Sequence, residues 1–118
     1  MKGSELDVFK ESHKMVLRIY EITENFPKKE NYRIIDQLVR SAYSVPSNII
    51  EGNNRNSSNE YIHFLYIARG SLHEAMYFLL LSKDLKYIGQ EIYQELTDTC
   101  NKIGKMLNGL INYLKSKK

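Results

Sequence analysis

Glu60 and His63 have the spacing in this chain that comes nearest to a catalytic motif. The pattern Glu-x-x-His occurs in di-iron helical bundles, where two helices each carry the motif and two further helices each supply a glutamate. This chain has one copy of the motif, and Glu60 also fits the acidic position of a helix-capping box that begins at Ser57. A di-metal bundle enzyme is therefore a remote alternative.

Other residues that could support catalysis lack the partners that they would need. His13, His63 and His73 do not form the i,i+4 pairs of a helical zinc site. Cys100 has no adjacent histidine or lysine that would activate its thiol, and no glycine-rich phosphate loop is present. We therefore expect no enzymatic activity, no catalytic residue, no metal site and no cofactor.

Polar residues follow one side of an expected second helix. Their spacing of i, i+4, i+8 and i+11 places them on one face, and they are Arg40, Ser44, Asn48 and Glu51. On the next helix, Gly70 is flanked by Arg69, Ser71 and Glu74. These side chains are either solvated at the surface or joined in a hydrogen-bond network across a helix–helix or subunit contact.

Apolar residues recur at intervals of three and four along the chain, which predicts the amphipathic helices that carry these side chains. Phe26-Pro27 ends the first helix because a residue before proline avoids the α conformation. Ser57 and Glu60 form the capping box of the third helix, and Gly89 belongs to the connection before the fourth. The expected helices cover residues of about 5–25, 30–51, 58–86 and 90–115.

Pro46, Gly52 and Gly70 interrupt this pattern in different ways. Pro46 removes one backbone hydrogen bond, but the apolar spacing continues in phase to Ile49, which predicts a kink and not a break. Gly52 is expected in the left-handed position that ends the helix. Gly70 lies in mid-helix, where glycine is tolerated best if a neighbouring helix comes close.

A length of 118 residues fits one domain. Four helices of about 20–30 residues with short turns pack as an antiparallel up-and-down bundle. We therefore predict a single all-α domain over residues 1–118, an antiparallel up-and-down four-helix bundle with a kinked second helix.

The composition favours a cytoplasmic protein. No run of 18 apolar residues is present, so we expect no membrane span. The N-terminal residues include acids where a signal peptide needs an apolar stretch. A single cysteine, Cys100, cannot form an internal disulfide and fits a reducing compartment.

The formal net charge is +3, and it is unevenly distributed. No acid follows Asp98, and the lysines beyond it are Lys102, Lys105, Lys115, Lys117 and Lys118. Basic residues near a helix C-terminus complement the helix dipole. A contact with nucleic-acid phosphates is the other explanation.

The stretch from residue 37 to 74 is similar to the signature of a known family. The two matching runs are Q-L-V-R-S-A-Y-S-V-P-S-N-I-I-E-G-N-N-R and S-S-x-E-Y-I-x-F-L-x-I-A-R-G-S-L-x-E. They resemble the bacterial four-helix-bundle proteins encoded in intervening sequences of 23S rRNA genes. The positions that carry the resemblance are Arg40, Ser44, Pro46, Asn48, Glu51, Gly52, Arg55, Glu60, Arg69, Gly70, Ser71 and Glu74.

This resemblance implies a left-handed bundle that assembles as a homopentamer around a central opening, without enzymatic activity. A related protein, the accessory variability determinant of diversity-generating retroelements, is a basic pentameric bundle that binds nucleic acid and a reverse transcriptase. The present chain departs from the family pattern at Ile50 and Asn53, where alanine and phenylalanine are frequent, and it is less basic than the accessory proteins.

Apolar residues beyond a single core face also favour self-association. The first helix has one apolar or amphipathic line that comprises Leu6, Phe9, His13, Val16 and Tyr20. Additional apolar residues on the first two helices are Met15, Ile19, Ile22, Ile34, Tyr43 and Ile50. Nine tyrosines add amphipathic contact surface.

Two functions remain as hypotheses. The first is a non-catalytic oligomeric bundle that binds RNA, DNA or a nucleoprotein partner, with candidate contacts at Arg40, Arg55, Arg69, Lys102 and Lys105. The alternative is a scaffold that binds a partner protein without nucleic acid.

Overall fold

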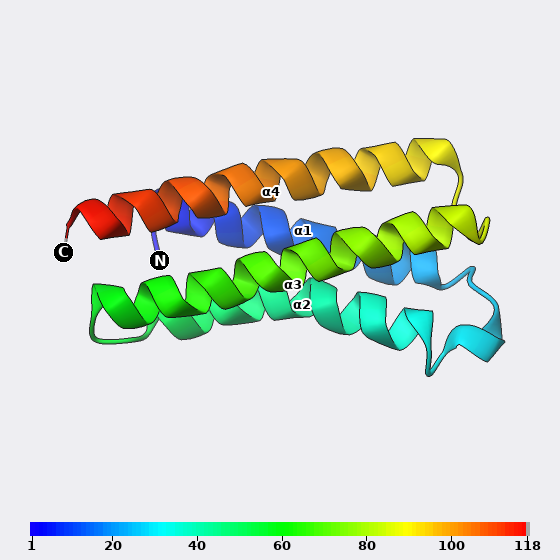
Figure 1. Ribbon diagram of the computed structural model, residues 1–118, viewed down its shortest axis with the longest axis horizontal. Coiled ribbons are helices and arrows are strands. Elements are labelled where there is room, and N and C mark those ends of the chain that lie inside the picture. Colours follow the sequence, from blue (N-terminus) through cyan, green and yellow to red (C-terminus); the bar gives the residue numbers. More distant parts are fainter. Residues whose placement is uncertain (118) are drawn as a thin grey trace.

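The computed structural model describes residues 1–117, and in this range the chain folds into four long α-helices and a short 3-10 helix (Figure 1). The elements are α1 (Ser4–Thr23), η1 (Lys28–Glu30), α2 (Ile34–Asn53), α3 (Ser58–Asp84) and α4 (Gln90–Ser116). Successive helices run in opposite directions, and α1 and α3 each pack against both α2 and α4. The predicted up-and-down four-helix bundle is confirmed.

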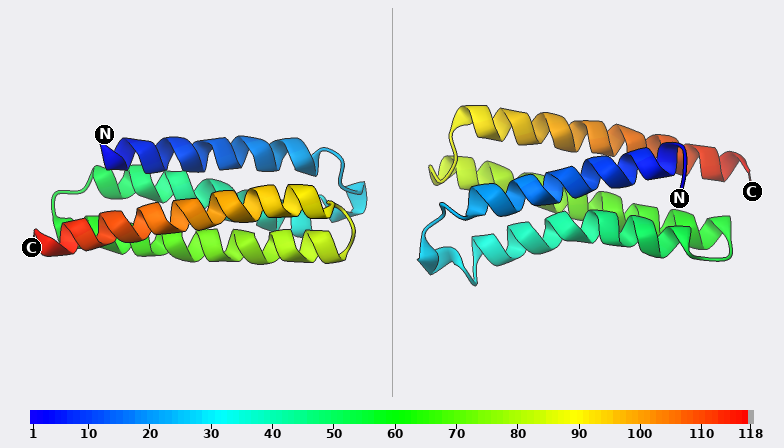
Figure 2. Two further views of the ribbon diagram at one scale, coloured as in Figure 1. Left: turned by 90° about the horizontal axis from the view of Figure 1, so that it is seen from above. Right: turned by 180° about the vertical axis from the view of Figure 1, so that it is seen from behind.

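The bundle measures 46 × 25 × 19 Å and has two distinct ends. Both termini and the α2–α3 connection lie at one end, while the α1–α2 and α3–α4 connections lie at the other (Figures 1 and 2). α3 and α4 form the face turned to the viewer in Figure 1, and α1 and α2 form the opposite face, seen on the right in Figure 2. None of the helices in the described range is long and apolar enough to cross a membrane.

The core runs along the bundle axis, and it corrects the predicted orientation of the first helix. Met15, Ile19 and Ile22, expected as additional surface, are buried in the core of the single chain. Tyr20 and His13, assigned to the first apolar line, are exposed instead. Burying Val8, Met15 and Ile19 removes more apolar area from water than burying His13 and Tyr20 would. The side of α1 that carries Val8, Met15 and Ile19 therefore faces the core.

The start of the second helix was predicted too early. α2 begins at Ile34, not near residue 30, and η1 occupies the preceding positions. Glu30 is only 3% exposed; its carboxylate accepts a hydrogen bond from the Tyr87 hydroxyl at 2.7 Å and lies 3.1 Å from Arg33. This contact holds the segment against the α3–α4 connection as a tight turn, which prevents Glu30 from starting the helix.

Gly52 and Gly70 do not have the roles predicted for them: Gly52 is not a helix cap, and Gly70 is not a point of close helix approach. Gly52 lies within α2 without a left-handed conformation, and a Cβ there would come 2.8 Å from Tyr61 Cδ1 and 2.9 Å from Phe64 Cβ. The close helix approach predicted at Gly70 therefore occurs at Gly52, while a Cβ at Gly70 would meet nothing within 4 Å. α2 continues unbroken through Pro46, as its apolar spacing indicates.

Candidate nucleic-acid interface

Two residues of the polar line of α2, Ser44 and Asn48, form a hydrogen-bond network with Ser71 of α3. The Ser44 and Ser71 hydroxyl oxygens are 2.9 Å apart, and Asn48 Nδ2 donates to the carbonyl and hydroxyl oxygens of Ser44 at 2.8 and 3.0 Å. Because a polar pair between helices is satisfied in one alignment only, this network fixes the register of α2 against α3.

The arginines of the same region form ion pairs with carboxylates nearby in the sequence. Arg40 Nε lies 2.9 Å from Asp36 one turn earlier on α2. Arg55 pairs with Glu51 and places its guanidinium 4.8 Å from the centre of the Phe64 ring. These two arginines therefore bring little free positive charge to the surface.

The five predicted nucleic-acid contacts do not share one face. Arg40 lies on α2 and Arg55 in the connection from α2 to α3, and Lys102 on α4 faces α1, where its ammonium is 3.6 Å from Glu11. Arg69 and Lys105, by contrast, both lie along the contact between α3 and α4. The structure thus brings two of the five together.

A groove of about 330 Å³ separates α3 from α4 on the outer surface. Its apolar floor includes Leu72 and Met76, and its rim includes His73, Asn101 and Lys105. The groove is open partly because Gly104, which lines it, has no side chain. A shallow groove of this kind has room for a flat group with an apolar face and a polar edge.

Contacts continue the rim of this groove toward the C-terminal end of α4. Arg69 Nη1 donates to Asn108 Oδ1 at 2.9 Å. Arg69 and Lys115 also lie over the ring of Tyr66, at 4.8 and 5.3 Å from its centre. We call Arg69, Lys105 and Lys115 the basic strip. Sequence reasoning noted the charge of Lys115 but not its place beside Arg69, and it gave no signal for Asn108.

The basic strip lacks acidic partners, and in this respect its arginine differs from the other arginines. Among the residues that the structure describes, Arg69, Lys105 and Lys115 form no ion pair, whereas four arginines each pair with a carboxylate: Arg18, Arg33, Arg40 and Arg55. Residues 61–73 of α3 and 99–116 of α4 include no aspartate or glutamate. The strip therefore lies on a long surface without negative side chains.

Of the residues considered for catalysis, Glu60 and His63 are exposed on α3, whereas Cys100 is buried in the core. Ser57 Oγ accepts the backbone N–H of Glu60 at 3.2 Å, as the capping box predicts. Burial raises the pKa of the Cys100 thiol to about 12. No cluster of three or more His, Cys, Asp or Glu side chains able to hold a metal occurs in residues 1–117.

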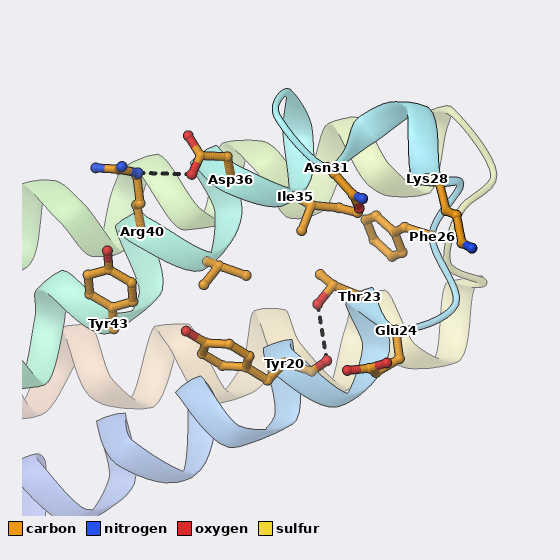
Figure 3. A pocket seen from close by; sticks show the side chains of 11 residues that line it. Tyr20, Thr23, Glu24, Phe26, Lys28, Asn31, Ile35, Asp36, Arg40 and Tyr43 are labelled. Atoms are coloured by element: carbon orange, nitrogen blue, oxygen red, sulfur yellow. Dashed lines mark hydrogen bonds and ion pairs between the residues drawn. The ribbon is translucent and has the colours of Figure 1, made fainter.

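A larger groove, of about 560 Å³, lies between α1 and α2 and was not predicted. Figure 3 shows Tyr20 of α1 and Tyr43 of α2 on opposite sides of it, with Phe26 and Ile35 toward the η1 end. Tyr20 and Tyr43 are 48% and 42% exposed. This groove has paired charges at its edge, because Arg40 is bound to Asp36.

Comparisons with known proteins agree with the four-helix fold. Residues 4–109 match the family model of the 23S rRNA-intervening sequence proteins. The structure is similar to a crystal structure of a protein of unknown function from the S23 ribosomal protein family of Bacteroides thetaiotaomicron, with a TM-score of 0.86 and 25% sequence identity over 93% of this chain and 99% of the other. A search of curated proteins found no match. The four-helix architecture and the match over most of its length show that the chain belongs to the family of 23S rRNA-intervening sequence proteins.

Proposed function

We propose that the chain is a non-catalytic helical bundle that binds nucleic acid through the basic strip. The observation that carries this proposal is the absence of carboxylates around Arg69, Lys105 and Lys115 in the described part of the chain. A cation without an ion pair can contact a phosphate without first losing a carboxylate, and each such contact releases a counterion from the nucleic acid. The strip is thus the surface best suited to a polyanion.

The helix dipole accounts for only part of this charge. Lys115 lies in the last turn of α4, where a cation complements the partial negative charge of the helix end. Lys105 lies about three turns before the end of α4, and Arg69 lies in the middle of α3. Because the dipole effect is confined to the last turn, these two residues favour the phosphate explanation.

Two charge-matched triple variants test this proposal in a gel-retardation assay at about 50 mM salt, where phosphate contacts are strong. One replaces the strip by glutamine, and the control replaces three ion-paired cations of the original candidates. The variants are R69Q/K105Q/K115Q and R40Q/R55Q/K102Q.

Both triples lower the net charge by the same amount, so a non-specific charge effect weakens binding equally in both. We expect the strip triple to lose at least about tenfold in affinity and the control to lose far less. Equal losses, or a wild-type protein that retards neither RNA nor DNA, would contradict the proposal. Circular dichroism checks that both variants remain helical.

We further propose that the chain assembles as a homopentamer, as the family resemblance implies. A closed ring joins two different surfaces of each copy. Exposed apolar residues occur on two sides of the bundle, one on α1 and α2 and the other on α3; they are Leu17, Tyr20, Tyr43, Ile50, Ile67, Tyr77 and Leu80. Contact between these two sides would cover both.

Sedimentation measurements test the assembly. We expect a particle of five times the 13.9 kDa mass of the chain. Y43K, which places a charge in the α1–α2 groove, should shift the particle toward single chains, while Y32K, in a loop, should leave it intact. A wild-type protein that sediments as a single chain would exclude the ring.

A protein-binding scaffold is the second candidate, and the α1–α2 groove favours it. The groove has aromatic sides and a volume of about 560 Å³, which suits the apolar side chains of a partner protein, such as the reverse transcriptase that the family resemblance suggests. A partner retained after nuclease treatment by the wild type, but not by Y43K, would support this candidate.

A further inference from the structure

We infer that the ligand of the basic strip is a single-stranded nucleic acid and that the α3–α4 groove holds one of its unpaired bases. This inference rests on the proposed function, since it names the form of nucleic acid that the same surface binds. It depends on three features. The strip forms one line, the α3–α4 surface is too broad to enter the major groove of a duplex, and the groove beside the strip has the lining that a base requires.

The strip is a single row of positive charge. Lys105 lies at the rim of the groove, and Asn108 on the next turn accepts a hydrogen bond from Arg69. Arg69 and Lys115 both lie over the ring of Tyr66. From Lys105 to Lys115, α4 rises by about 15 Å. One row of cations can follow one phosphate backbone, whereas the two strands of a duplex present two rows.

The α3–α4 surface also lacks a shape that could enter a duplex. An α-helix with its side chains is about 10 Å wide, and the major groove of B-DNA admits one helix. α3 and α4 lie side by side along nearly their whole lengths, so the pair is too broad for this groove (Figure 1). A duplex could touch the strip from outside, but its base edges would remain out of reach.

The groove offers contacts that an unpaired base can use and a base inside a duplex cannot. Leu72 and Met76 provide an apolar floor, and the rim supplies the amides of Asn101 and Asn108. Amide side chains can hydrogen-bond to base edges, and single strands are usually bound by combining such contacts with stacking. The guanidinium of Arg69, whose carbon lies 4.8 Å from the centre of the Tyr66 ring, is a further surface on which a base can stack.

Gly104 allows the groove to be filled without a change of charge. A Cβ at Gly104 would lie 3.6 Å from Leu72 Cδ2, an ordinary contact, so the first carbon of a larger side chain fits there, and the leucine of G104L should occupy the groove. Gly109 is on the same helix, and a Cβ there would meet nothing within 4 Å. G109L is therefore a matched control that adds the same side chain outside the groove.

The test measures fluorescence anisotropy of labelled RNA and DNA oligonucleotides, each as a single strand and as its own duplex, with the wild-type protein. We expect each single strand to bind at least about tenfold more tightly than its duplex. G104L should weaken single-strand binding by about tenfold, which corresponds to the loss of one stacked base. G109L should leave the affinity unchanged.

Two results would overturn this inference and still leave the proposed function intact. One is duplex binding as tight as single-strand binding and dependent on Arg69, Lys105 and Lys115. The other is equal affinity of G104L and G109L for the single strand. If neither form of nucleic acid binds the wild type, the proposed function fails and the inference fails with it.

Discussion

At the scale of single residues, surroundings decide what a residue type does in this bundle. Gly52 permits a close contact between α2 and α3. Gly70 is exposed, so its lack of a side chain lowers the stability of α3 without allowing a closer contact. In the same way, Arg40 forms an ion pair with the carboxylate of Asp36. Arg69 instead donates to the neutral amide of Asn108 and lies over the ring of Tyr66. The free charge of Arg69 is what makes it a candidate for phosphate binding.

The two glycines give opposite predictions for the same substitution. G52A should lower the free energy of unfolding by about 1–3 kcal/mol, because its methyl group would overlap the Cβ of Phe64 and force α3 to shift. G70A should raise it by about 1 kcal/mol, since alanine is the better helix former at an open position. Urea unfolding of both variants measures the difference. Equal effects of the two substitutions would show that α2 and α3 are not in close contact at Gly52.

At the scale of helices, side-chain bonds between neighbours align the bundle. The Ser44, Asn48 and Ser71 network aligns α2 with α3, and Arg18 aligns α1 with α4 through Glu95. The Glu30 and Tyr87 contact joins the two connections at one end. α4 has fewer such constraints on its α3 side, where Arg69 and Asn108 border an open groove.

The Arg18 and Glu95 pair predicts a pH dependence of stability. Hydrogen bonds from Arg18 lower the pKa of Glu95 below its ordinary value of 4.5. A lowered pKa contributes stability at pH values above 4.5, and this contribution is lost as the pH falls through the pKa of the folded state. Because the pair is exposed, the contribution is at most about 1 kcal/mol.

We therefore expect R18Q to unfold more easily than the wild type at neutral pH and to approach it in strong acid. Thermal unfolding of the two proteins across the pH range checks this. K14Q, an exposed change on the same helix, is the control and should differ little from the wild type at any pH. A difference between R18Q and the wild type that does not shrink in acid would contradict the role of Glu95.

Local signals were enough to predict most of the helices but not the contacts between them. The capping box at Ser57 and the apolar spacing fixed the start of α3 and the fold class. The start of α2 was missed because Glu30 is held by Tyr87, 57 residues later. Likewise, Arg69 and Asn108 are 39 residues apart, so the groove exists only once α3 and α4 are packed.

At the scale of the whole molecule, opposite faces of the bundle suit different partners. The α1–α2 face has exposed tyrosines around a groove in which Arg40 is paired with Asp36, which suits protein contacts, either with other copies or with a partner. The α3–α4 face has free cations and amides, which suits a polyanion.

The salt dependence of nucleic-acid binding tests the central claim most directly. Affinity should fall linearly with the logarithm of the salt concentration, and for a single strand each phosphate contact contributes a slope of about 0.7. R69Q/K105Q/K115Q should reduce this slope by about 2, and R40Q/R55Q/K102Q should leave it nearly unchanged. Equal slopes for the wild type and the strip triple would contradict the assignment of the basic strip as the nucleic-acid interface.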